Sequence, residues 1–127
     1  MKQLAVLATS ALLLGCAATL DTAATTTTDL PSPLPPEALY RNVVTAMRAC
    51  YAVPNIRVEG DYFTEARAAS LRLIWGNSVG VIEWLRIDIA SASAGSSLRA
   101  VHRTAQDRFP AALAAWTRGD ASDCPYR

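Results

Sequence analysis

The sequence has little of the chemistry that most enzyme sites require. It contains a single histidine, His102, and no Gly-x-Ser-x-Gly segment to present a nucleophilic serine. We expect His102 near the end of a strand, at the surface or half-buried. The carboxylates Glu59, Asp61 and Glu65 do not have the spacing of a calcium loop and are expected on a solvated turn. These absences predict a non-enzymatic protein without a cofactor or metal.

Lysine is almost absent, since Lys2 is the only one. The twelve Lys and Arg residues face eleven Asp and Glu residues, so without Lys2 the formal charges of the chain cancel. Binding to nucleic acid depends largely on neutralisation of phosphates by a basic surface. A nucleic-acid partner is therefore not expected.

The chain also lacks an apolar run long enough to span a bilayer. Leu4–Leu14 is apolar and follows the basic Lys2, but it has only the length of a signal-peptide core. It ends in Leu13-Leu14-Gly15-Cys16, which resembles the lipobox of bacterial lipoproteins. The alternative is an uncleaved anchor or a buried helix that happens to contain a cysteine.

The lipobox resemblance implies that residues 1–15 are removed and that Cys16 becomes the acylated first residue. More than one acyl chain at this residue would give stable anchoring, at about 0.8 kcal/mol for each buried CH₂ group. Ala17 stands where an Asp would commonly retain such a protein at the inner membrane. The resemblance thus implies an outer-membrane lipoprotein with its domain in the periplasm.

Residues 16–36 lack any amphipathic period and are rich in threonine, alanine and proline. Such a composition cannot bury a core and is expected to form a flexible tether behind the lipidated Cys16. The folded domain is then expected over residues 37–127, which is enough chain for one small domain.

The patterns within residues 37–127 predict a helix, four strands and a second helix. Glu37–Cys50 has helical spacing, and a further helix is expected to begin at Asp107 and to end at Gly119. The intervening strands are expected at 56–59, before a turn at Gly60-Asp61, and at 66–75, 79–89 and 98–103. Short turns between them indicate an antiparallel meander. The predicted fold is α+β, with both helices on one face of a four-stranded sheet.

Two cysteines, Cys50 and Cys124, remain once Cys16 is assigned to lipidation. An exported protein enters an oxidising compartment, so we expect these two to form a disulfide that joins the ends of the helices. In the chain-entropy model a loop of this length is worth on the order of 4 kcal/mol. A redox or metal pair is the alternative, but it lacks the usual Cys-x-x-Cys spacing or a sufficient ligand set.

The segment Val81–Ile89 is the strongest strand signal. Simple alternation places Glu83 on the core face and places Ile82, Trp84, Arg86 and Asp88 on the other face. Arg72 on the neighbouring strand is expected to join this second group. Because tryptophan and arginine are enriched in binding hot spots, the second group is the candidate partner face. The alternative is a tryptophan that is covered by the tether or partly exposed without a function.

The layout as a whole resembles small, uncharacterised lipoproteins of Gram-negative bacteria. The resemblance is carried by the lipobox, the Thr/Pro segment, Cys50-Tyr51, the stretch Trp84–Ile89 and the closing Cys124. It implies no particular activity or ligand. Three functions therefore stay open: an envelope module that binds a protein partner, an inhibitor or immunity-type lipoprotein using the expected loop Ser91–Ser97, and a small-ligand or lipid carrier.

Overall fold

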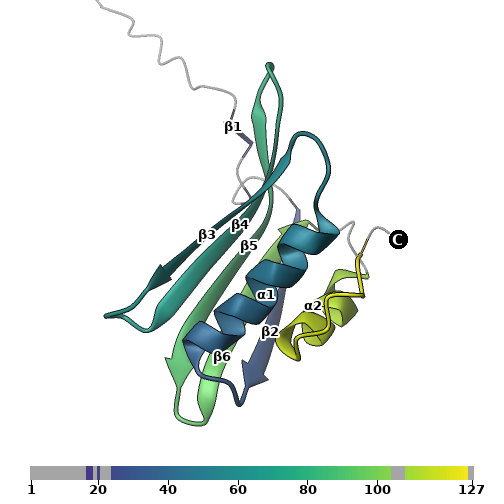
Figure 1. The fold of residues 1–127 in the computed structure, drawn as a ribbon. Helices are drawn as coiled ribbons and strands as arrows, with labels where there is room; N and C mark the ends of the chain where they lie inside the picture. Colours follow the sequence, from purple (N-terminus) through teal and green to yellow (C-terminus); the bar gives the residue numbers. More distant parts are fainter. Residues whose placement is uncertain (1–16, 19, 21–23, 104–107, 126–127) are drawn as a thin grey trace, which may run out of the picture.

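Figure 1 shows the chain in a computed structural model, which describes residues 17–18, 20, 24–103 and 108–125. The element order is β1, β2, α1, β3, β4, β5, β6, α2, with the bounds Ala17–Ala18, Thr25–Ser32, Pro36–Cys50, Ile56–Phe63, Ala68–Gly76, Val81–Ala92, Gly95–Arg103 and Phe109–Thr117. Neither helix in these ranges combines the length and apolarity needed to cross a membrane. The expected signal peptide, residues 1–15, and the expected lipidation site, Cys16, lie outside the described residues.

The domain is α+β, with an antiparallel sheet and two helices, as predicted. The expectation of four strands is wrong, because five strands form the antiparallel path β2-β6-β5-β4-β3. In addition, the two-residue strand β1 pairs parallel with β5. In the five-stranded path, β5 is central and lies between β6 and β4.

The additional antiparallel strand, β2, comes from the segment expected to be a flexible tether. Thr25–Ser32 pairs with β6 along its whole length, from Thr25 opposite Arg103 to Ser32 opposite Ser96. Threonine is β-branched and suits an extended strand. Pro31 is tolerated because β2 is an edge strand, where a missing N–H need not break a ladder. The tether prediction is wrong for these residues, and the folded domain starts before residue 37.

Helix α1 follows the predicted span closely. Pro36 occupies its first turn and Glu37 lies near its positive end, as both residue types prefer. One side of the helix is buried in the core through Leu39, Val43 and Met47. The apolar spacing read from the sequence therefore identifies the face that packs.

Strand β3 continues past the turn that was expected at Gly60-Asp61 and reaches Phe63. Gly60 stays within the ladder, opposite Leu71. A Cβ atom at Gly60 would lie 2.9 Å from the Tyr40 hydroxyl oxygen, so the glycine permits α1 to pack closely on β3. The residue that suggested a turn is required here for close packing instead.

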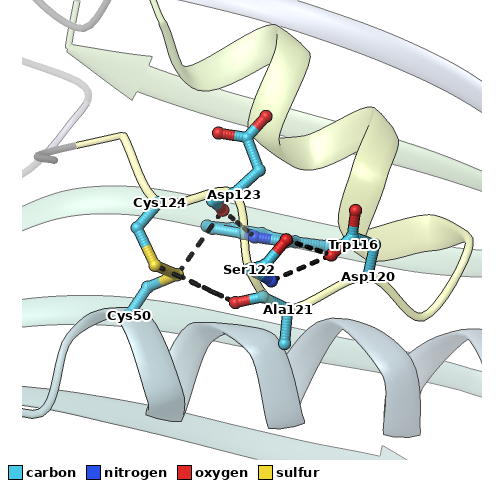
Figure 2. Close-up of a disulfide and its surroundings, with 7 residues drawn as sticks. All are labelled: Cys50, Trp116, Asp120, Ala121, Ser122, Asp123 and Cys124. Atoms are coloured by element: carbon cyan, nitrogen blue, oxygen red, sulfur yellow. Dashed lines mark hydrogen bonds between the residues drawn. A yellow bond between two sulfur atoms is a disulfide. The ribbon is translucent and has the colours of Figure 1, made fainter.

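The C-terminal segment is fixed to α1 by the predicted disulfide between Cys50 and Cys124 (Figure 2). The bond joins residues 74 positions apart and thereby links the end of α1 to the segment after α2. Beside it, Nε1 of Trp116 donates a hydrogen bond to the carbonyl oxygen of Asp123 at 2.7 Å. The expected N-cap Asp107 lies outside the described residues, whereas Gly119, with a φ of 83°, follows the end of α2 as predicted.

One buried cluster joins residues of both helices to alternate residues of β4, β5 and β6, including Leu71, Leu85 and Leu98. The inward positions of β6 continue to His102, which is only 2% exposed. Its ring centroid lies 4.7 Å from that of Phe109. The expectation of a surface or half-buried histidine is therefore wrong, because strand alternation directs this side chain into the core.

The turn between β5 and β6 provides a test of how closely the edge strand is packed. Gly95 has a φ of +129°, and a Cβ atom there would lie 2.3 Å from the carbonyl oxygen of Ser32. We expect Gly95→Ala to lower the free energy of unfolding by about 2 kcal/mol or more, through backbone strain and displacement of β2. Urea denaturation measures this loss.

Gly76→Ala is the matched control, since its Cβ would meet Val81 at an ordinary 3.6 Å. Equal losses of stability in the two variants would contradict the close packing of β2 against this turn.

Candidate functional site

Charged side chains cover the sheet face opposite to the core. Directly paired residues of neighbouring strands share a face, and the register pairs Glu59 with Arg72, Arg72 with Arg86, and Asp88 with Arg99. Their sequence neighbours, such as Leu71 and Ile87, belong to the core cluster. We call this surface the charged face and define it by Asp29, Arg57, Glu59, Arg72, Glu83, Arg86, Asp88 and Arg99.

A β-bulge in β5 adds Glu83 to the charged face. Leu73 pairs with Leu85, but the next residue of β4, Ile74, pairs with Glu83, so Trp84 is the extra residue. The extra residue shifts the alternation by one position. The expectation that Glu83 faces the core is therefore wrong.

The same shift separates Ile82 from the charged residues. Ile82 pairs with Trp75, which lies one residue beyond Ile74 and therefore faces away from the charged face. Trp84 is half-buried and packs against the core cluster, and its Nε1 atom is buried. Of the five residues proposed from the sequence as a partner face, the structure brings Arg72, Arg86 and Asp88 together but does not bring Ile82 to them.

Five charged groups alternate in sign across β3, β4 and β5. Nε of Arg57 lies 2.9 Å from Oε1 of Glu59, and Oε2 of Glu59 lies 2.6 Å from a guanidinium nitrogen of Arg72. Glu83 continues the row, because its carboxylate oxygens lie 3.9 Å from Arg72 and 2.9 Å from Nε of Arg86. We call this row the charge ladder.

The ladder offsets an unfavourable pairing within the sheet. Arg72 and Arg86 stand directly opposite each other, and like charges in such positions destabilise a sheet. Glu83 interacts with both guanidinium groups, and only 10% of its side chain is exposed. Arg72 keeps 47% of its side chain exposed, so it is both fixed in position and accessible.

Two acidic groups of the charged face, Glu59 and Asp29, have pKa values lowered by their arginine partners. A hydrogen bond from Arg57 lowers the pKa of Glu59, and the positive charge of Arg72 acts in the same direction. At the other side of the sheet, a hydrogen bond from Arg99 lowers the pKa of Asp29, and Asp29 in turn raises the pKa of Arg99. Near neutral pH the face therefore presents fixed positive and negative groups.

A surface hollow of about 450 Å³ adjoins this second ion pair. Its lining includes Asp29, Asp88 and Arg99, together with Leu30 and Pro31 of the edge strand. Because β2 supplies part of this lining, the hollow exists only through the strand that was expected to be a tether. The sequence signal that was available was the run of β-branched threonines.

The structure places the residues of two other candidate sites differently from the prediction. The segment Ser91–Ser97, expected to be a loop, is mostly strand, because β5 extends to Ala92 and β6 begins at Gly95. Asp61 and Glu65 are exposed, whereas Glu59 belongs to the charge ladder. In the described part of the chain, no group of three or more His, Cys, Asp or Glu side chains is placed to hold a metal ion.

Comparisons with known proteins give a structural likeness only. No family model matches the chain, and no curated protein matches it. Among solved structures, the protein CV1439 from Chromobacterium violaceum is similar at 14% identity, over 77% of this chain and 91% of that chain, with a TM-score of 0.31.

The ladder predicts an unequal effect of two carboxylate substitutions on β5. Glu83→Gln removes the negative charge between Arg72 and Arg86, and we expect it to lower the free energy of unfolding by about 1–3 kcal/mol. Asp88→Asn, the control on the same strand, changes an exposed residue and should have little effect. Urea denaturation of both variants measures the difference in the free energy of unfolding. Equal stabilities would contradict a structural role for the ladder.

Proposed function

We propose that the protein is a non-enzymatic lipoprotein of the bacterial outer membrane that presents a small domain to a protein partner in the periplasm. In this proposal residues 1–15 are a signal peptide, Cys16 carries the lipid, and the charged face binds the partner. No cofactor, metal or nucleic acid takes part.

The anchor is supported by the sequence around Cys16 and by the chemistry of the other cysteines. The stretch Leu13-Leu14-Gly15-Cys16 follows an apolar segment of signal-peptide length. The disulfide between Cys50 and Cys124 suits an oxidising compartment such as the periplasm. Export and lipidation would together account for all three cysteines.

The observation that carries the partner proposal is the charge ladder. Arginine side chains held by carboxylates lose less freedom when a partner binds, and arginine is enriched at binding hot spots. The proposal takes both helices to cover the same sheet face, which their shared core cluster supports. The charged face is then left for a partner, whose own charges would select the register of the complex.

A non-enzymatic role is consistent with the surroundings of the single histidine. His102 is 2% exposed and packs against Phe109, so it is poorly placed to meet a substrate. Both ladder carboxylates, Glu59 and Glu83, form ion pairs with arginines. The arginine partners lower the pKa of Glu59, which disfavours proton exchange at that residue. Binding is the function that these groups support best.

The anchor is tested by metabolic labelling with radioactive palmitate in a Gram-negative host. We expect the full chain to incorporate label and to sediment with outer membranes. Cys16→Ser should lose both properties, because the thiol that accepts the lipid is gone. An unlabelled wild-type chain in the soluble fraction would contradict the lipoprotein proposal.

The partner face is tested by crosslinking the lipidated protein in native envelopes and comparing two arginine variants. Arg72→Ala should reduce capture of a specific protein by about tenfold, the effect of losing a hot-spot side chain. Arg48→Ala on the exposed side of α1 is the control and should leave capture unchanged. Equal capture by the two variants, both with the disulfide formed, would contradict binding through the charged face.

A further inference from the structure

The hairpin formed by β4 and β5 ends in an uncharged apolar tip. Between Arg72 and Glu83 the chain reads Leu-Ile-Trp-Gly-Asn-Ser-Val-Gly-Val-Ile, ten residues without a charge. Val79 is 88% exposed and Val81 is 42% exposed. Both are among the large apolar side chains left exposed in the described part of the chain. Figure 1 shows this hairpin projecting beyond the ends of the helices.

The tip has a defined conformation. The side-chain oxygen of Asn77 accepts hydrogen bonds from the backbone N–H groups of Val79 and Gly80, at 2.8 and 3.1 Å. The backbone N–H of Asn77 in turn donates to the carbonyl oxygen of Gly80. These bonds hold Val79 at the turn, where its side chain faces solvent.

Strand β1 brings the start of the described chain to this hairpin. Ala17 pairs with Val81, and Ala18 pairs with Ile82 (Figure 1). Ala17 is bonded directly to Cys16, the residue that carries the lipid in the function proposed above. A lipid on Cys16 would therefore enter the membrane beside the apolar tip.

We propose that the hairpin tip, Val79 with Val81, rests in the surface of the lipid bilayer that holds the Cys16 anchor. This inference depends on the proposed lipidation. A bilayer suits the tip because the tip carries no charge that would have to leave water. Val79 lies four residues before Glu83, about 13 Å of extended strand, whereas interfacial segments enter to about 5–10 Å. The ladder would thus stay in water.

The contact would orient the domain as well as strengthen its anchoring. A lipid alone leaves the domain free to rotate above the membrane, whereas a second contact at the hairpin tip restricts that rotation. The long axis of β4 and β5 would then point away from the bilayer. The turn at Ser93-Ala94, at the opposite end of β5, would be held far from the membrane.

Quenching of tryptophan fluorescence by brominated lipids tests this contact in the full, lipidated chain. The protein is reconstituted into phosphatidylcholine vesicles with and without bromine on the acyl chains. Val79→Trp should lose a larger share of its emission on bromination than Ala94→Trp, the control at the opposite end of β5. Both positions are exposed, so neither substitution disturbs the core. Equal fractional losses of emission would overturn the proposal.

Intact mass measured before reconstitution separates this inference from the proposed function. Acyl chains present on the protein together with equal quenching of the two variants contradict only the contact of the hairpin with the bilayer. An unmodified Cys16 contradicts the anchor, and the hairpin proposal fails with it.

Val79→Asp provides a second measurement with the natural tryptophans. Trp75 lies on the same hairpin and should be quenched in the wild-type chain, and the new charge should reduce that quenching by withdrawing the tip. Ala94→Asp should leave it unchanged. Equal quenching of wild type and Val79→Asp would count against the proposal.

Discussion

The register shift in β5 determines which of its side chains face the core and which belong to the charged face. On one side of the shift, Leu85 and Ile87 face the core and Arg86 faces outward. Beyond it, Glu83 faces outward as well, which supplies the carboxylate between Arg72 and Arg86. If β5 alternated regularly through Trp84, without the bulge, Glu83 would enter an apolar core and the two arginines would lose a common partner. One backbone irregularity therefore satisfies a charged residue and completes the charge ladder.

Two links between residues far apart in the sequence close the domain around its small core. Strand β2 is held at the edge of the sheet by β6, and the segment after α2 is held to α1 by the disulfide. Both links join residues about 70 positions apart in the sequence, from Asp29 to Arg99 and from Cys50 to Cys124. A chain of this size gains much of its stability from such links, because its core buries a limited area.

The charged face and the hairpin tip differ in the environment that they favour. Each charge in the ladder is held by an opposite charge, which allows the face to meet water or a polar partner without an unpaired buried ion. The tip carries no charge over ten residues and exposes valines instead. The two surfaces lie along the same strands, so a contact at the tip would set the direction in which the charged face is presented.

Local patterns in the sequence were enough to predict both helices, the meander of β3 to β6 and the disulfide partners. Periodicity, turn residues and the count of cysteines depend on near neighbours or on composition, and these can be read without a structure. For the candidate site, the same alternation predicted that Arg72, Arg86 and Asp88 share a face.

Only the tertiary structure decided which strand pairs with which and in what register. The pairing of Thr25 with Arg103 and the shift at Trp84 both depend on partners distant in sequence. A threonine-rich segment can be a tether or an edge strand, and the available edge of β6 decided between them. A single extra residue reverses the alternation beyond it, because strand side chains repeat every two residues. The sequence therefore determined the elements, and the packing of distant strands determined which side chains meet.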